Sequence, residues 1–257
     1  MKSLWTGAIG FGLVNIPVKL YSATQQSDLD LDMLDKKDHA NIRFQRVNEK
    51  TGREVPYANI VRAFKYEGRY VVLDDEDFKK ASPEKTKMIE IVEFVEESDI
   101  DSIYYETPYY LEPQKSGEKA YVLLRDALKK TGKTGLSTFV LRSKESLALL
   151  KTSGDVLILQ KIRYKEEIRE TEDLKIPSAA SKPAELKMAT TLIDQLSGKF
   201  DISRYKDTYA SELMKLIAAK AKGKKIAAPT MKVVHSRSKD LMEQLKASLG
   251  TKRKKAS

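Results

Sequence analysis

The residues of this chain best suited to chemistry are cations, and they are dense in the stretch 36–65. That stretch reads KKDHANIRFQRVNEKTGREVPYANIVRAFK and holds eight Lys/Arg against three acids. Apolar residues alternate with cations around 42–47 and recur around 60–65, and NEKTGR (48–53) between them has the Gly and small polar residues of a hairpin loop. The pattern predicts two paired strands that present a row of cations, which suits the evenly spaced phosphates of duplex DNA. The candidate contacts are Lys36, Lys37, Arg43, Arg46, Lys50, Arg53, Arg62 and Lys65.

The stretch 36–65, called the ribbon below, could instead be a solvent-exposed sheet edge whose charges discourage aggregation. The distribution of charge along the chain helps to decide between these two interpretations. The net charge is +10, and residues 215–257 hold 13 Lys/Arg against 2 acids. By contrast, residues 66–115 hold 14 acids against 6 bases. This segregation favours a polyanionic partner approached from one side. The last cations of the chain, which are further candidate DNA contacts, are Lys252, Arg253, Lys254 and Lys255.

The residue types that usually carry catalysis or metal binding are scarce. The chain has no cysteine, and its two histidines, His39 and His235, are far apart. The segment GKTG at 132–135 lacks the first half of a phosphate-binding loop, and no G-x-S-x-G motif occurs. We therefore expect no metal, no cofactor and no enzymatic activity. A lysine that forms a Schiff base with an abasic sugar stays open as an alternative.

The amino terminus does not resemble a targeting segment. Lys2 is followed by SLWTGAIGFGLVNIPVKL, which is too short and too alternating to span a membrane. The absence of cysteine fits a reducing interior. We therefore expect a cytoplasmic protein that has no membrane partner.

The elements that must position the ribbon alternate with the period of strands over most of the first 178 residues. One helical stretch, 117–131, interrupts them and stops at Gly132. Many strands against one central helix predict a β-rich α+β fold, a β-barrel with embellishments over 1–178. The expected strands are a pair within 3–24 joined near Gly12, then 69–73, 86–95, 103–113, 136–142, 146–150 and 156–164, and a short helix begins at 74–77.

The final part of the chain is helical in pattern. Two amphipathic helices are expected at 185–196 and 204–222, and together they make a helical arm over 179–223. This arm could return to its own barrel or reach to another subunit. Residues 224–257 are expected to form a mobile basic tail with one short helix over 239–249. The apolar and aromatic residues of the arm are Leu186, Leu192, Ile193, Leu196, Tyr205, Tyr209, Leu213 and Leu216.

Several segments, in this order along the chain, together resemble the bacterial Ku protein of non-homologous end joining. The likeness extends from about residue 2 to residue 223, and the tail matches only in kind. The segments that carry it are SLWTGAIGFGLVNIPVKLYSAT (3–24), YYLEP (109–113), KAYVLLRDAL (119–128), FVLRSKESLALL (139–150) and FDISRYKDTY (200–209).

The resemblance implies a homodimer whose barrels and bridging ribbons, about 30–66 in each chain, form a ring threaded by linear double-stranded DNA ends. It implies that the bound dimer recruits the end-joining DNA ligase (ligase D) in the bacterial cytoplasm, at the nucleoid. The helical arm would then serve dimerisation and partner contact, and the tail would add DNA affinity. The family is not known for ligase chemistry, and no K-x-D-G motif occurs. An architectural duplex-binding protein without end preference is the alternative.

Overall fold

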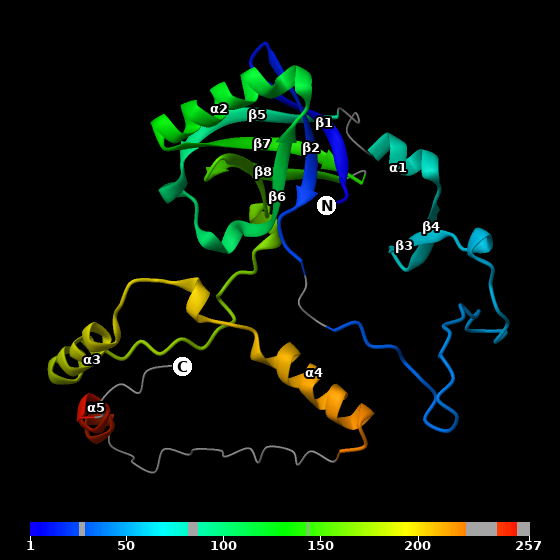
Figure 1. Ribbon diagram of the computed structural model, residues 1–257. Helices are drawn as coiled ribbons and strands as arrows, with labels where there is room; N and C mark the ends of the chain where they lie inside the picture. The colour runs from blue at the N-terminus through cyan, green and yellow to red at the C-terminus, as the bar shows by residue number, and fades with distance from the viewer. Residues whose placement is uncertain (26–28, 82–86, 143, 225–240, 251–257) are drawn as a thin grey trace. The chain divides into compact units, whose positions relative to one another are not determined.

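The structure is a computed structural model that describes residues 1–25, 29–81, 87–142, 144–224 and 241–250 (Figure 1). The chain divides into two compact units. One comprises Met1–Gln26 and Asp30–Glu170, and the other comprises Ser27–Leu29 and Thr171–Ser257.

Within the described residues, seven strands of the first unit close into a barrel in the order β1-β2-β6-β9-β8-β7-β5. Neighbouring strands are antiparallel except β1 and β5, which are parallel and close the barrel. Closure leaves these strands without a free edge. The predicted β-rich α+β class is confirmed. The strands are β1 (Trp5–Phe11), β2 (Val14–Ser22), β5 (Met88–Glu96), β6 (Tyr105–Pro113), β7 (Lys133–Leu141), β8 (Lys144–Ser153) and β9 (Val156–Ile162).

The core lies inside the barrel because alternate residues of each strand point inward. Helix α2 (Glu118–Thr131) lies against β2, β7 and β8 and adds its own buried face to this core. It ends at Gly132, whose φ of 70° gives the left-handed cap that the sequence predicts. Most of the aliphatic core consists of Ile9, Ile16, Val18, Leu20, Ile89, Leu111, Leu150, Leu157 and Leu159, with Leu124 and Leu128 from α2.

A buried tyrosine joins α2 to two strands of the barrel. The hydroxyl of Tyr121 donates to the main-chain oxygen of Leu111 at 2.8 Å and accepts from the main-chain nitrogen of Leu157 at 2.7 Å. These two residues face each other across β6 and β9. One side chain therefore satisfies a main-chain donor and an acceptor that are closed off from water.

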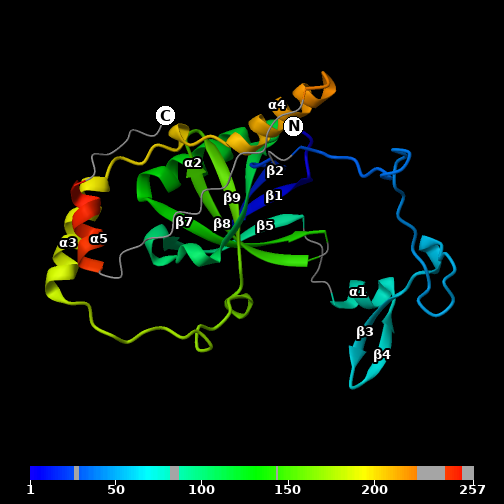
Figure 2. The ribbon, with the colours of Figure 1, turned by 90° about the horizontal axis from the view of Figure 1, so that it is seen from below.

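A second, two-stranded sheet follows the predicted hairpin loop. Strand β3 (Arg62–Tyr66) pairs with β4 (Arg69–Leu73), and the helix α1 (Asp75–Ala81) comes directly after β4 (Figure 2). Glu67 and Gly68 connect the strands in a two-residue turn that requires a positive φ at both positions, and their φ values are 46° and 82°. The predicted pairing of 42–47 with 60–65 is wrong, because β3 takes β4 as its partner. Residues 42–47 form no regular strand, and Val47 only bridges Glu54.

The second unit contains three helices among its described residues: α3 (Pro183–Leu196), α4 (Thr208–Ala221) and α5 (Leu241–Gly250). The predicted helices are confirmed, although Tyr205 lies before α4 and not within it. Helices α3 and α5 lie side by side (Figures 1 and 2). None of the helices in the described part of the chain is long and apolar enough to cross a membrane.

Candidate nucleic-acid interface

The first turn of the ribbon presents two neighbouring lysines. Leu34 bridges Asn41, and the main-chain nitrogen of Asp35 donates to the oxygen of Ala40 at 2.8 Å. The side chain of Asp35 also accepts from the main-chain nitrogen of Lys37 at 2.8 Å. These bonds fix the backbone of the turn and leave the ammonium groups of Lys36 and Lys37 exposed.

The second turn is the loop that the sequence predicts, and it presents two more cations. The Asn48 side chain accepts from the main-chain nitrogens of Lys50, at 3.0 Å, and Thr51, at 3.1 Å. The main-chain nitrogen of Asn48 donates to the oxygen of Arg53 at 2.9 Å, and Gly52 adopts a φ of 64°. Local bonds of Asn and the freedom of Gly build this turn. The side chains of Lys50 and Arg53 are therefore not needed to hold it.

Two further arginines, Arg43 and Arg46, lie between these turns and are exposed. The guanidinium of Arg46 stands 5.2 Å from the ring centroid of Tyr57. Tyr57 is itself 77% exposed. A cation over an exposed ring keeps its hydrogen-bond donors free for phosphate oxygens, because the ring occupies only its face.

Arg62 is the most constrained of the predicted contacts. Its guanidinium lies 3.7 Å from the ring centroid of Phe78 and donates to Asp75 at 3.0 Å. Its interactions tie the start of β3 to α1. Lys65, three residues later, is exposed and stands opposite Tyr70 in the hairpin.

Arg69, which the sequence pattern did not predict as a contact, is also exposed and stands opposite Tyr66 at the end of the same hairpin. The signal that could have found it is the pair Glu67-Gly68, two residues between two β-prone runs. The sequence pattern predicted a strand at 69–73 but no partner for it, so Arg69 was not among the predicted contacts of the ribbon.

All eight contacts predicted within 36–65 are exposed, and most of them form neither an ion pair nor a ring contact with any residue that the structure describes. Apart from the ion pair of Arg62 with Asp75, none of them forms an ion pair within the described residues. Six of these eight predicted contacts have neither an ion pair nor a ring contact in the described part of the chain: Lys36, Lys37, Arg43, Lys50, Arg53 and Lys65. The predicted contacts Lys252, Arg253, Lys254 and Lys255 lie outside the described residues.

With the exception of Tyr205, which precedes α4, the predicted arm residues lie on helices α3 and α4. None of the residues of α3 and α4, all of which are described, is buried. Exposure reaches 64% at Ile193 and 72% at Tyr205 and Tyr209. Leu186 and Leu196 are also exposed, whereas Leu192, Leu213 and Leu216 are half-buried. The arm therefore presents an unusual amount of apolar surface to solvent.

No catalytic arrangement emerges from the part of the chain that is described. No three His, Asp or Glu side chains within it come together as a metal site. The half-buried lysines Lys151 and Lys161 donate to Glu97 at 2.5 Å and to Glu106 at 2.9 Å. Schiff-base formation needs an amine with a free lone pair, and these two amines are committed to carboxylates.

Comparison with known proteins shows the family to which this chain belongs. Residues 10–188 match the family described as "Ku70/Ku80 beta-barrel domain". A "Non-homologous end joining protein Ku" of Coxiella burnetii is 39% identical over 266 residues, which cover 98% of this chain and 96% of that protein. Proteins of the same name from Bacillus subtilis, 38% identical over 99% of this chain and 83% of the relative, and from Pseudomonas aeruginosa, 39% identical over 86% and 77%, are similar. The chain therefore belongs to the Ku family.

Proposed function

We propose that this protein binds the ends of double-stranded DNA in non-homologous end joining, without regard to sequence, as a ring-shaped homodimer. The observation that carries the proposal is the exposed ribbon in a member of the Ku family. Its cations suit phosphates, which carry no sequence information. Preference for ends then arises from topology, because a closed circle offers no end over which a ring can pass.

The free cations set the expected dependence on salt. Of the eight predicted contacts within 36–65, six per chain, or twelve per dimer, carry neither an ion pair nor a ring contact among the described residues. Each neutralised phosphate contributes about 0.9 to the slope of log affinity against log salt, so the ribbon supports a slope of up to about −11. A weakly charged binding surface would give a much flatter dependence.

The apolar arm supports dimerisation. Side chains such as Ile193 and Tyr209 are largely exposed in the single chain, and a second copy would remove them from water. Burying apolar surface contributes about 25 cal/mol per Å², and a two-fold interface uses the same patch twice. The arm also provides a surface for the end-joining DNA ligase (ligase D) once the dimer is on DNA. We place this activity in the bacterial cytoplasm, at the nucleoid, and assign the protein no catalytic step.

Competition between DNA topologies tests the proposal. A labelled 30-bp duplex bound to the full chain is competed with supercoiled, nicked and linearised forms of one plasmid at equal mass and salt. We expect the linear form to compete and both circles to fail. Blocking both ends of a loaded linear duplex with streptavidin should then trap the protein against a high-salt wash. Equal competition by circles, or release despite blocked ends, would refute the ring.

A second candidate is an architectural protein that binds duplex DNA anywhere. The observation that favours it is the concentration of 13 Lys/Arg in residues 215–257. A chain that ends after Gly223 separates the two functions. An architectural protein would lose nearly all binding, whereas a ring would keep its preference for ends with reduced affinity.

A further inference from the structure

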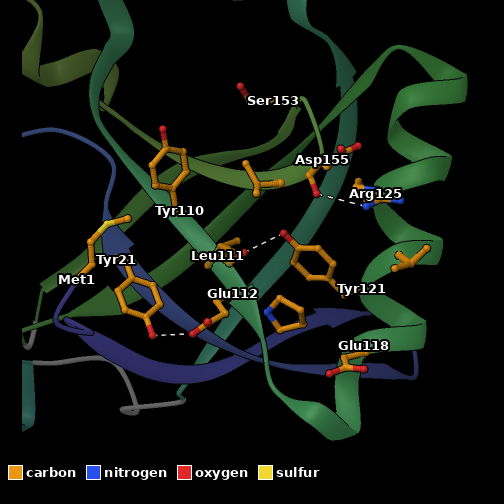
Figure 3. A pocket seen from close by; sticks show the side chains of 13 residues that line it. Met1, Tyr21, Tyr110, Leu111, Glu112, Glu118, Tyr121, Arg125, Ser153 and Asp155 are labelled. Carbon is orange, nitrogen blue, oxygen red and sulfur yellow. Dashed lines mark hydrogen bonds between the residues drawn. The ribbon is translucent and has the colours of Figure 1, made fainter.

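The outer face of the barrel carries a groove between strand β6 and helix α2, and nothing proposed above uses it. The groove has a volume of about 920 Å³. Figure 3 shows Tyr21 and Tyr110 on one side of it and Tyr121 on the other, with Glu112 between them. Because the barrel strands are fully paired, a ligand here meets side chains and not a free strand edge.

The floor and walls of the groove are aromatic and apolar. Val122 on α2 is 42% exposed and Val156 at the start of β9 is 39% exposed, and both line the groove. The rings of Tyr21 and Tyr110 are half-buried. This lining suits one or two aliphatic side chains of an extended segment, which an open groove of this size can hold.

The lining of the groove holds three carboxylates, on Glu112, Glu118 and Asp155, against the guanidinium of Arg125 and the amino terminus at Met1. Neither Glu112 nor Glu118 takes part in an ion pair within the described residues. Glu112 accepts from the hydroxyl of Tyr21 at 2.6 Å, and this hydrogen bond raises the pKa of Tyr21. The bond holds the carboxylate beside an aromatic ring, an arrangement that binds guanidinium and ammonium groups through a charged hydrogen bond and the ring face.

Two of the nearby cations are already paired with carboxylates, whereas Lys19, which stands opposite Glu112 across β2 and β6, forms no ion pair within the described residues. Arg125 pairs with Asp126 at 2.8 Å and donates to the main-chain oxygen of Asp155 at 3.3 Å, and the hydrogen bond to Asp126 raises its pKa. Lys129 pairs with Asp155 at 3.1 Å. Two carboxylates thus remain to attract a cation, and they would repel DNA phosphates.

We propose that the groove between β6 and α2 docks an extended segment of a partner protein in which arginine or lysine stands next to aliphatic residues. Charge complementarity selects this occupant, since the apolar lining takes the aliphatic side chains and the free carboxylates take the cation. The site has the opposite charge preference to the ribbon. A protein segment and duplex DNA can therefore be bound at the same time.

Peptide selection on the full chain tests this proposal. A display library of random octapeptides is selected on the wild-type chain and counter-selected on the double variant Glu112→Gln, Glu118→Gln. The matched control is Glu90→Gln, Glu93→Gln, which removes two exposed carboxylates of β5 and the same charge. We expect enrichment of Arg or Lys beside aliphatic residues. Enrichment without cations, or none that survives the counter-selection, would overturn the proposal.

The enriched peptide, labelled with fluorescein, then serves as the probe for anisotropy titrations. We expect the groove variant to weaken its binding about tenfold, since two charged hydrogen bonds are lost, and the β5 control to leave it unchanged. Tyr110→Phe should retain binding and Tyr110→Ala should lose it, with thermal melting to show that both variants fold. An equal loss in the β5 control, or displacement by a 30-bp duplex, would contradict the proposal. So would a peptide of residues 241–257 of this chain that binds in the groove more tightly, because the occupant would then be the chain itself.

Discussion

The turn at residues 47–54 offers a sharp test of phosphate binding, because its cations can be removed without disturbing its backbone. Lys50→Gln together with Arg53→Gln removes two free charges from each chain. The turn is held by the side chain of Asn48, which accepts from two main-chain nitrogens at 3.0 and 3.1 Å, and by main-chain bonds. The variant should therefore fold and dimerise as the parent does.

The expected loss follows from counterion release. A dimer of the variant lacks four cations, so the slope of log affinity against log salt should become less negative by up to about 3.6. Extrapolated from 1 M to 0.15 M salt, that change corresponds to an affinity for a 30-bp duplex that is lower by up to about a thousandfold. Fluorescence anisotropy at four or more salt concentrations measures both quantities.

A matched control removes the same charge from another surface. Lys115→Gln with Lys119→Gln neutralises two exposed lysines, one in the turn that precedes α2 and one in the first turn of α2. This variant should keep the parental salt slope. Two results would refute the reasoning: an unchanged slope in the turn variant, or an equal change in both variants, which would mean that only net charge matters.

Three further predictions concern the stability of the first unit. Tyr121→Phe leaves the main-chain nitrogen of Leu157 without its 2.7 Å partner, so it should cost about 1–3 kcal/mol and lower the Tm by about 2–4 °C per kcal/mol; an unchanged Tm would contradict this. Glu67→Asn replaces a residue at φ 46° with one that tolerates this region, and it should stabilise the β3–β4 hairpin by about 0.5–1 kcal/mol, measured as slower amide exchange across the hairpin; faster exchange would count against the turn geometry. The hydrogen bond from Lys129 holds the pKa of Asp155 below its ordinary value, so this carboxylate stabilises the fold above its unfolded pKa and the contribution is lost as the pH falls through the folded pKa. Urea titrations at pH 7 and near pH 3 should therefore show a smaller acid-induced loss in Asp155→Asn than in the parent.

The barrel could be predicted because its information is local. Alternation of apolar residues gives the strands, and the change of period at 117–131 gives α2. Gly12, with a φ of 56°, marks the turn between the first two strands. Local patterns do not show how the barrel closes. It closes through the parallel pairing of β1 with β5, in which Ile9 stands opposite Ile89. That contact depends on how the whole sheet curls.

The ribbon shows why alternation alone is not enough. The run 42–47 alternates as a strand would, yet a strand also needs a partner, and the chain places β4 next to β3 through the shorter Glu67-Gly68 turn. The candidate cations themselves were predictable, since exposure follows from charge. The ring contact of Arg62 with Phe78 and its ion pair with Asp75 could not be predicted, because they depend on the position of α1.

The barrel and the segments proposed to bind DNA and a second chain differ in how much apolar surface they bury within a single chain. The barrel buries its own core and closes its own edges, so it can fold without help. The β3–β4 hairpin has only two strands, with Phe64 65% and Tyr70 74% exposed, and a two-stranded hairpin is marginal in water. No residue of α3 or α4 is fully buried, so these helices too have little to stabilise them alone. Such segments would gain most from a partner surface, because DNA or a second chain would cover their free cations and apolar side chains. In the proposed ring, DNA would cover the free cations of the ribbon and a second chain would cover the apolar side chains of the arm, whereas the barrel buries its core within a single chain.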